Sequence, residues 1–162
     1  MALQPQNRDI SAADGATITM QAKAWKGTPY KLVGPGSILG DGGDCSGSTW
    51  RIYAAAKFDY DYQATATFPD YVAAKKKFRE LGPDEAMQEG DILYWSNHMA
   101  IFSNFANDPD DASVDRVNAK GQHWTQTNDM WTATHPGGKP YGPGKMSYFK
   151  PDEPPRVFRY QK

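Results

Sequence analysis

Residues 43–47 read Gly43-Asp44-Cys45-Ser46-Gly47 and contain the single cysteine of the chain. Before it, residues 34–43 are rich in glycine, which lets a loop bend closely, and after it residues 46–57 have apolar side chains at helical spacing. Cys45 is therefore predicted at a helix N-terminus, where unpaired backbone N–H groups lower the pKa of a thiol and can hold a developing oxyanion. A free cysteine is by default a small buried hydrophobe, but these polar, glycine-rich flanks favour a nucleophile.

A thiol nucleophile needs a base, and His98 is the best candidate among the three histidines. It follows a strand-like run at residues 91–95 and opens a second one at residues 99–105, so its side chain is expected at a sheet edge. A histidine beside apolar residues is more often structural than catalytic. The catalytic interpretation of His98 therefore depends on the presence of Cys45.

Three separated strings in the chain follow the order of a known signature. They are Gly27-Thr28-Pro29-Tyr30, Asp44-Cys45-Ser46-Gly47, and Gly90-Asp91-Ile92-Leu93-Tyr94-Trp95 before His98-Met99-Ala100-Ile101-Phe102. In this order and spacing the sequence resembles the NlpC-type family of papain-like cell-wall peptidases, over about residues 16–160. The resemblance implies a papain-like α+β fold. It also implies that the thiol attacks, without a cofactor, an amide of the peptidoglycan stem peptide, often the bond between D-glutamate and a diamino acid.

In that family a third polar residue orients the histidine, and it commonly follows on the next strand in a hydrophobic-polar-Ala string. Val117-Asn118-Ala119 fits that place, and Asn118 is the predicted third catalytic residue, because its amide carbonyl can accept the imidazole N–H. His123 is the rival, since histidine is frequent at this position in the family, although it follows Lys120-Gly121, where a turn is expected. Asn118 can also be an ordinary strand-end or turn residue.

The resemblance also indicates residues that bind substrate around the nucleophile. Tyr30 matches the family's tyrosine, whose hydroxyl can reach the substrate or the oxyanion, and Asp44 and Ser46 flank Cys45. As an alternative, Tyr30 is an ordinary half-buried aromatic residue. The loop at residues 34–43 is longer than the family's usual glycine pair, so the wall of the cleft and the choice of bond are expected to differ.

The rest of the sequence predicts helices first and strands later. Helices are expected at residues 16–26, with Asp14 as cap, at 46–57 and at 69–81, and strands at 91–95, 99–105, 114–118 and 157–160. Residues 134–155, rich in Gly and Pro, are expected to form an irregular lid or cleft wall. The order predicts one α+β domain at residues 16–162, with helices packed on a small antiparallel sheet, after a loose N-terminal arm at residues 1–15.

Composition argues against several classes of function. The net charge of −1 gives no long-range field to attract nucleic acid or an anionic membrane. No apolar run reaches membrane-spanning length, and residues 1–20 lack the apolar core of a secretory signal. The residues that could supply soft metal ligands are Cys45, His98, His123 and His135. No two of them have the spacing of a metal site, so no metal is expected.

Together these features predict a peptidoglycan hydrolase that is made in the cytoplasm. Because no secretory signal or wall-binding module is found, we expect export by a dedicated machinery such as type VI secretion, as a toxin for the periplasm of a target cell. The producer would then need a protective inhibitor protein. One alternative is a catalytically idle papain-like module that binds a wall peptide or a protein partner, although the full set of Cys45, His98 and a polar third residue argues against it. Another is an enzyme for an acyl chain or a protein side chain.

Overall fold

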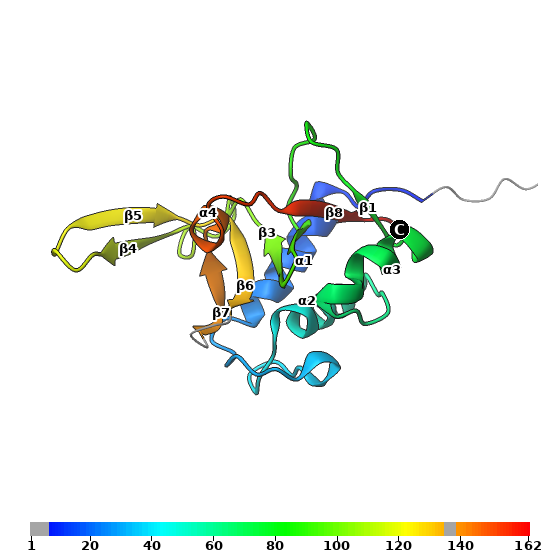
Figure 1. The fold of residues 1–162 in the computed structure, drawn as a ribbon, viewed down its shortest axis with the longest axis horizontal. Helices are drawn as coiled ribbons and strands as arrows, with labels where there is room; N and C mark the ends of the chain where they lie inside the picture. The colour runs from blue at the N-terminus through cyan, green and yellow to red at the C-terminus, as the bar shows by residue number, and fades with distance from the viewer. Residues whose placement is uncertain (1–6, 135–138) are drawn as a thin grey trace, which may run out of the picture.

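A computed structural model of the chain describes residues 7–134 and 139–162. Its helices are α1 (Ala12–Ala24), α2 (Cys45–Ala55), α3 (Phe68–Lys75) and α4 (Met146–Phe149), with short 3-10 turns at Gly34–Gly36 and Thr65–Thr67. Its strands are β1 (Phe78–Glu80), β2 (Ile92–Trp95), β3 (His98–Phe102), β4 (Ser113–Val117), β5 (His123–Thr127), β6 (Met130–Thr134), β7 (Lys139–Gly144) and β8 (Arg156–Tyr160). Within the described residues, a six-stranded antiparallel sheet has the order β1-β8-β2-β3-β6-β7, and the β4–β5 hairpin projects from this body (Figure 1).

The sheet carries a core on each of its faces, because alternate residues of a strand point to opposite sides. In β3, Met99 and Ile101 join the larger apolar cluster, which includes residues of α1, α2 and α3, whereas Ala100 joins a smaller cluster. His98 lies two residues before Ala100. Its side chain is therefore on the face turned away from these three helices.

A loose arm was expected at residues 1–15. The structure places the second half of this arm in the folded domain, and residues 1–6 lie outside the described part of the chain. Ser11 Oγ accepts from the Asp14 N–H and the Ser11 N–H donates to the Asp14 carboxylate, both at 3.1 Å. Ser11 rather than Asp14 is therefore the cap of α1. The Ile10 N–H donates to the Tyr160 carbonyl at 3.0 Å, which ties this segment to the end of β8.

The predicted helix at residues 69–81 is wrong in its second half. α3 ends at Lys75, its C-cap Lys76 has a left-handed φ of 56°, and the chain then forms β1, with Phe78 opposite Tyr160 of β8. Phe78 is fully buried, and its ring centroid is 5.1 Å from that of Tyr60. The pairing with β8 and the burial of this ring outweigh the helical spacing of the apolar residues.

The helix predicted at residues 46–57 is confirmed as α2, and the four predicted strands are confirmed as β2, β3, β4 and β8. The sequence does not reveal β5, β6 and β7. Residues 134–155, expected to be irregular, contain β7 and α4, and residues 135–138 of that segment lie outside the described residues. β7 contains Pro140 and Pro143 and lies at the edge of the sheet, where a strand tolerates a residue without an N–H.

Candidate active site

Cys45 is the first residue of α2, and Asp44 caps this helix. One carboxylate oxygen of Asp44 accepts from the Gly47 N–H at 2.8 Å, and the other accepts from the Gly34 N–H at 2.7 Å. The side chain is only 4% exposed, so it joins the end of the helix to the glycine-rich loop. The structure thus uses Asp44, which was predicted to bind substrate, as a helix cap.

Gly47 allows the loop to approach the helix closely. A Cβ at this position would lie 2.1 Å from the Gly34 carbonyl oxygen and 2.1 Å from Ser37 Oγ. No side chain fits there unless the loop moves. The expectation that the loop at residues 34–43 bends closely is confirmed, because it packs on the first turn of α2, which carries Cys45.

The sulfur of Cys45 lies beside the start of β3, where the Met99 backbone hydrogen-bonds to it. The paired positions of β3 and β6 begin only at Ile101, opposite Trp131, so Met99 lies outside that ladder. The thiol therefore contacts the backbone of the residue next to His98.

The environment of Cys45 favours the protonated thiol. The side chain is half-buried, and burial raises its pKa above the ordinary value, while the Asp44 carboxylate acts in the same direction. Hydrogen bonds from the Met99 backbone and from the first backbone N–H groups of α2 oppose this shift. The helix N-terminus thus acts on the thiol as expected, but burial outweighs it. The prediction of a lowered pKa is wrong for this structure.

His98 is 3% exposed and lies against two aromatic rings. Its ring centroid is 5.8 Å from that of Trp95 and 4.3 Å from that of Phe149 in α4. Burial lowers the pKa of His98 to about 4, and the positive charge of Lys150 contributes to this shift. At neutral pH the imidazole is therefore uncharged and able to accept a proton.

Thr132 of β6 holds the imidazole, since its Oγ1 lies 2.7 Å from Nε2 of His98. The hydroxyl hydrogen of Thr132 can point to the carbonyl oxygen of Met99 or of Ala133, each at 3.4 Å. When the hydroxyl donates its one hydrogen to either carbonyl, Oγ1 accepts the Nε2–H of His98. Nδ1 is then the imidazole nitrogen that can take a proton.

The structure does not place Asn118, the predicted third residue, beside His98. Asn118 lies in the exposed turn of the β4–β5 hairpin, where its side-chain oxygen accepts from the Gln122 N–H at 3.0 Å. His123, the rival, opens β5 in the same hairpin. The hairpin leads away from the sheet between β3 and β6 (Figure 1), so the strand that follows β3 in the sequence is not its neighbour. The expected position of Asn118 is wrong for this reason, and Thr132 occupies that position.

The other two residues predicted to bind substrate differ in their surroundings. Burial raises the pKa of Tyr30, and the charges of Cys45 and Asp44 add to the shift, so Tyr30 is near the nucleophile. Ser46 is buried, and its hydroxyl oxygen lies 3.1 Å from the hydroxyl oxygen of Tyr62. Tyr30 therefore keeps its place as a candidate for substrate contact, whereas the side chain of Ser46 is engaged inside the protein.

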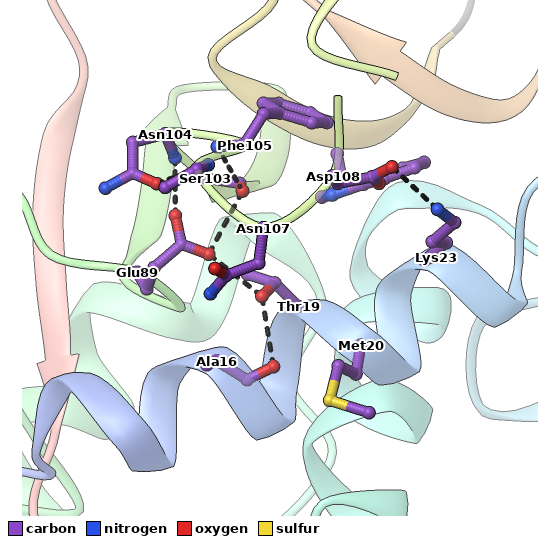
Figure 2. Close-up of a pocket in the computed structure, with 12 residues that line it drawn as sticks. Ala16, Thr19, Met20, Lys23, Glu89, Ser103, Asn104, Phe105, Asn107 and Asp108 are labelled. Atoms are coloured by element: carbon purple, nitrogen blue, oxygen red, sulfur yellow. Dashed lines mark hydrogen bonds and ion pairs between the residues drawn. The ribbon is translucent and has the colours of Figure 1, made fainter. Parts of the chain in front are cut away.

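A separate pocket of about 120 Å³ lies at the other end of β3 from His98 (Figure 2). The Glu89 carboxylate accepts there from the hydroxyl of Thr19 at 2.9 Å and from that of Ser103 at 3.0 Å. Figure 2 shows these three side chains turned toward one another. They tie α1 to the segment after β3, so we assign them a structural role.

Across residues 7–134 and 139–162, no group of three or more His, Cys, Asp or Glu side chains could hold a metal ion. His135, one of the metal candidates considered from the sequence, lies outside the described residues. Within the same two ranges, no helix is both long and apolar enough to cross a membrane.

The fold is similar to that of a solved protein from Staphylococcus aureus subsp. aureus Mu50, a crystal structure described as "similar to lipoprotein, NLP/P60 family". The TM-score is 0.54 at 18% sequence identity, and the match covers 98% of this chain. This chain shares the fold of that structure. It spans 44% of the length of that structure's chain. No protein-family model matches the sequence, and no curated protein matches it either. The α+β, papain-like architecture predicted from the sequence is thus confirmed at the level of the fold.

The string around Thr132 has the order that the sequence motif predicts for the third residue. Trp131-Thr132-Ala133 is hydrophobic-polar-Ala, as is Val117-Asn118-Ala119. Only the first string lies on a strand that pairs with β3. The motif could therefore have pointed to Thr132, but the sequence alone does not show that the hairpin separates the two candidate strings.

Proposed function

We propose that the chain is a cysteine hydrolase that cuts an amide bond of the peptidoglycan stem peptide. The observation that carries this proposal is the position of the Cys45 sulfur, at the start of α2 and in contact with the backbone next to His98. Thr132 holds the other side of the imidazole. A nucleophile, a base and an orienting group in this order support acyl transfer. The choice of substrate, with the D-glutamyl–diamino acid bond as first candidate, rests on the motif resemblance.

In the proposed reaction, the Cys45 thiol gives its proton to Nδ1 of His98 as the sulfur attacks the carbonyl carbon. The backbone N–H groups at the start of α2 lie around the sulfur, where they can donate to the oxyanion. Nδ1 then gives the proton to the amide nitrogen, the C–N bond breaks, and a thioester remains on Cys45. Water attacks the thioester and gives a proton to Nδ1. The C–S bond breaks, and that proton returns to the sulfur.

Thr132 is a positioning residue in this mechanism. Because its oxygen accepts from Nε2, it holds the imidazole in the tautomer whose Nδ1 is free to act as base. Delivery into the periplasm of a target cell and a protective inhibitor protein stay predictions from the sequence. The proposed chemistry does not depend on them.

The direct experiment incubates the purified protein with peptidoglycan and with synthetic stem peptides, and identifies new termini by mass spectrometry. We expect the wild type to cut one amide, and Cys45→Ala to be inactive with an unchanged circular dichroism spectrum. Cleavage by Cys45→Ala at the wild-type rate would contradict the mechanism. Peptide binding without any new terminus in the wild type would favour the idle binding module instead.

A further inference from the structure

A cavity of about 320 Å³ lies beside His98, on the sheet face turned away from α2. Thr132 and Phe149, which both contact the imidazole, form part of its wall. The rest of the wall comes from the β4–β5 hairpin, from β6 and β7, and from α4, which lie together in Figure 1. The cavity is therefore next to the proposed base and is formed by the segments that follow β3.

The charged residues that line this cavity are cations. They are Arg116 of β4, Lys139 of β7 and Lys145 just before α4, and no carboxylate from the described residues lines it. The chain as a whole has a net charge of −1, so this gathering of positive charge does not follow from composition. Within the described part of the chain, ion pairs form at other arginines and lysines but at none of these three. The charge of Lys145 acts on the carboxylate of Asp129, so Arg116 and Lys139 are the lining cations that favour an anionic ligand.

Arg116 is positioned by a buried side chain. Gln126 of β5 is 4% exposed, and its carbonyl oxygen accepts from Nε of Arg116 at 3.1 Å. The amide nitrogen of Gln126 donates to Asn128 at 2.8 Å, so both ends of the amide are used. Among residues 7–134 and 139–162, no hydrogen bond or ion pair uses Nη1 or Nη2 of Arg116, and these two nitrogens form the fork that suits a carboxylate. This support distinguishes Arg116 from a freely moving surface charge.

We propose that this cavity binds a carboxylate on the amine side of the bond that Cys45 cuts. The inference rests on the proposed function, in which His98 gives its proton to the leaving nitrogen. The leaving fragment therefore lies on the His98 side of the bond, and its substituents reach the cavity next to the imidazole. The α-carboxylate and the side-chain carboxylate of the leaving residue offer Arg116 the same chemistry. The enzyme is thus specific for an acidic leaving residue.

Three synthetic peptides with the same scissile amide test this specificity. One has both carboxylates of the leaving residue free, and each of the other two has one of them converted to a carboxamide. For the wild type, we expect kcat/KM to fall roughly tenfold to hundredfold when the recognised carboxylate is amidated, because a charge-assisted contact is lost. Arg116→Gln should lower kcat/KM about tenfold for the peptide with both carboxylates free. For the peptide whose recognised carboxylate is amidated, Arg116→Gln and the wild type should have the same kcat/KM.

The matched control is Lys120→Gln, which removes a cation from the same hairpin but outside the cavity. It should behave as the wild type with all three peptides. Arg116 is exposed, so its variant is expected to keep the fold, which circular dichroism checks. A loss of the same size in Lys120→Gln would mean that overall charge attracts the peptide, and would overturn the assignment to this cavity.

Calorimetric binding to Cys45→Ala separates the specificity from the reaction. This variant should bind the peptide with both carboxylates free about tenfold more tightly than the peptide whose recognised carboxylate is amidated. The double variant Cys45→Ala with Arg116→Gln should bind these two peptides equally. If the wild type cuts all three peptides equally, the cavity proposal is overturned and the hydrolase stands. If no peptide is cut but the Arg116-dependent discrimination is measured, the hydrolase fails and the carboxylate site stands. If Cys45→Ala shows no discrimination, the carboxylate site is overturned.

Discussion

The thiol of Cys45 and the imidazole of His98 are both neutral in the resting structure, because burial disfavours the charged form of each. Burial raises the pKa of the thiol and lowers the pKa of His98 to about 4. An ion pair therefore does not exist before substrate arrives. The proton has to move during attack, which makes the orientation of the imidazole important for the rate.

Replacing Thr132 by Val tests this orientation, since it removes the hydroxyl and keeps the branched shape. We expect kcat to fall about tenfold, because Nε2 loses its acceptor and the imidazole can adopt the other tautomer. Thr132→Ser should restore most of the rate, and the pH profile of kcat should shift in Thr132→Val but not in Thr132→Ser. Asn118→Ala, in the exposed hairpin turn, should behave as the wild type. A larger loss in Asn118→Ala than in Thr132→Val would return the orienting role to Asn118.

The pKa of His98 also predicts how stability depends on pH. Its value of about 4 in the folded chain lies below the ordinary 6.5, so the unfolded chain takes up a proton first as the pH falls. The free energy of unfolding should therefore decrease by on the order of 3 kcal/mol from pH 6.5 to about pH 4. Urea unfolding across this window measures the effect. His98→Gln should lose less stability over the same window, and an equal loss would contradict the assignment to His98.

At the scale of elements, the first turn of α2 and the loop before it form one unit that carries the nucleophile. The Asp44 carboxylate bonds both to the Gly47 N–H of the helix and to the Gly34 N–H of the loop. The small size of Gly47 allows this contact. The position of the Cys45 sulfur is thus set by a packing contact within this unit as well as by the helix cap.

Gly47→Ala tests this contact. The added methyl would meet the Gly34 carbonyl oxygen at 2.1 Å, so we expect the free energy of unfolding to fall by about 1–3 kcal/mol as the loop is displaced. Activity should fall as well, because the loop is joined to the cap of α2. Gly36→Ala is the matched control, since a Cβ there would meet only the Val33 Cβ at an ordinary 3.7 Å. Chemical denaturation of both variants should separate them, and equal losses would exclude the steric explanation.

At the scale of the whole molecule, a buried ion pair joins segments that are far apart in the sequence. Asp91 precedes β2 and is fully buried, and its two oxygens accept from Nε of Arg159 at 3.0 Å and from Nη2 at 2.9 Å. Burial raises the pKa of Asp91, while the hydrogen bonds from Arg159 and the Gln88 N–H oppose the shift. The Gly-Asp string before β2 therefore contributes a structural ion pair between distant segments rather than a reacting group.

Asp91→Ala should lower the free energy of unfolding by about 3–5 kcal/mol, because it leaves the Arg159 charge buried without its partner. Glu80→Ala is the control. Its carboxylate bonds to Arg156 at 2.9 and 2.8 Å in a similar two-pronged geometry, but both side chains are exposed. That loss should stay below about 1 kcal/mol. Thermal or urea unfolding measures both, and similar losses would mean that burial does not decide the contribution of the Asp91 pair.

The features that depend on short stretches of chain follow from local sequence patterns. The Gly-rich loop and the helical spacing after Cys45 lie within a few residues of one another, so local rules were sufficient to place the thiol at a helix N-terminus. The turn between two apolar runs likewise placed His98 at the start of a strand. These local patterns also predicted the α+β class.

The residue that contacts His98 and the protonation states of Cys45 and His98 depend on contacts between distant segments of the folded chain. The neighbour of β3 is β6 rather than β4, because an inserted hairpin leaves the sheet, and pairing across it selects Thr132 instead of Asn118. The pKa values of Cys45 and His98 depend on burial by segments distant in the sequence, Phe149 among them. The cavity beside His98 likewise needs four strands and a helix to meet. Such contacts form between residues that share no local pattern, so only the folded chain brings them together.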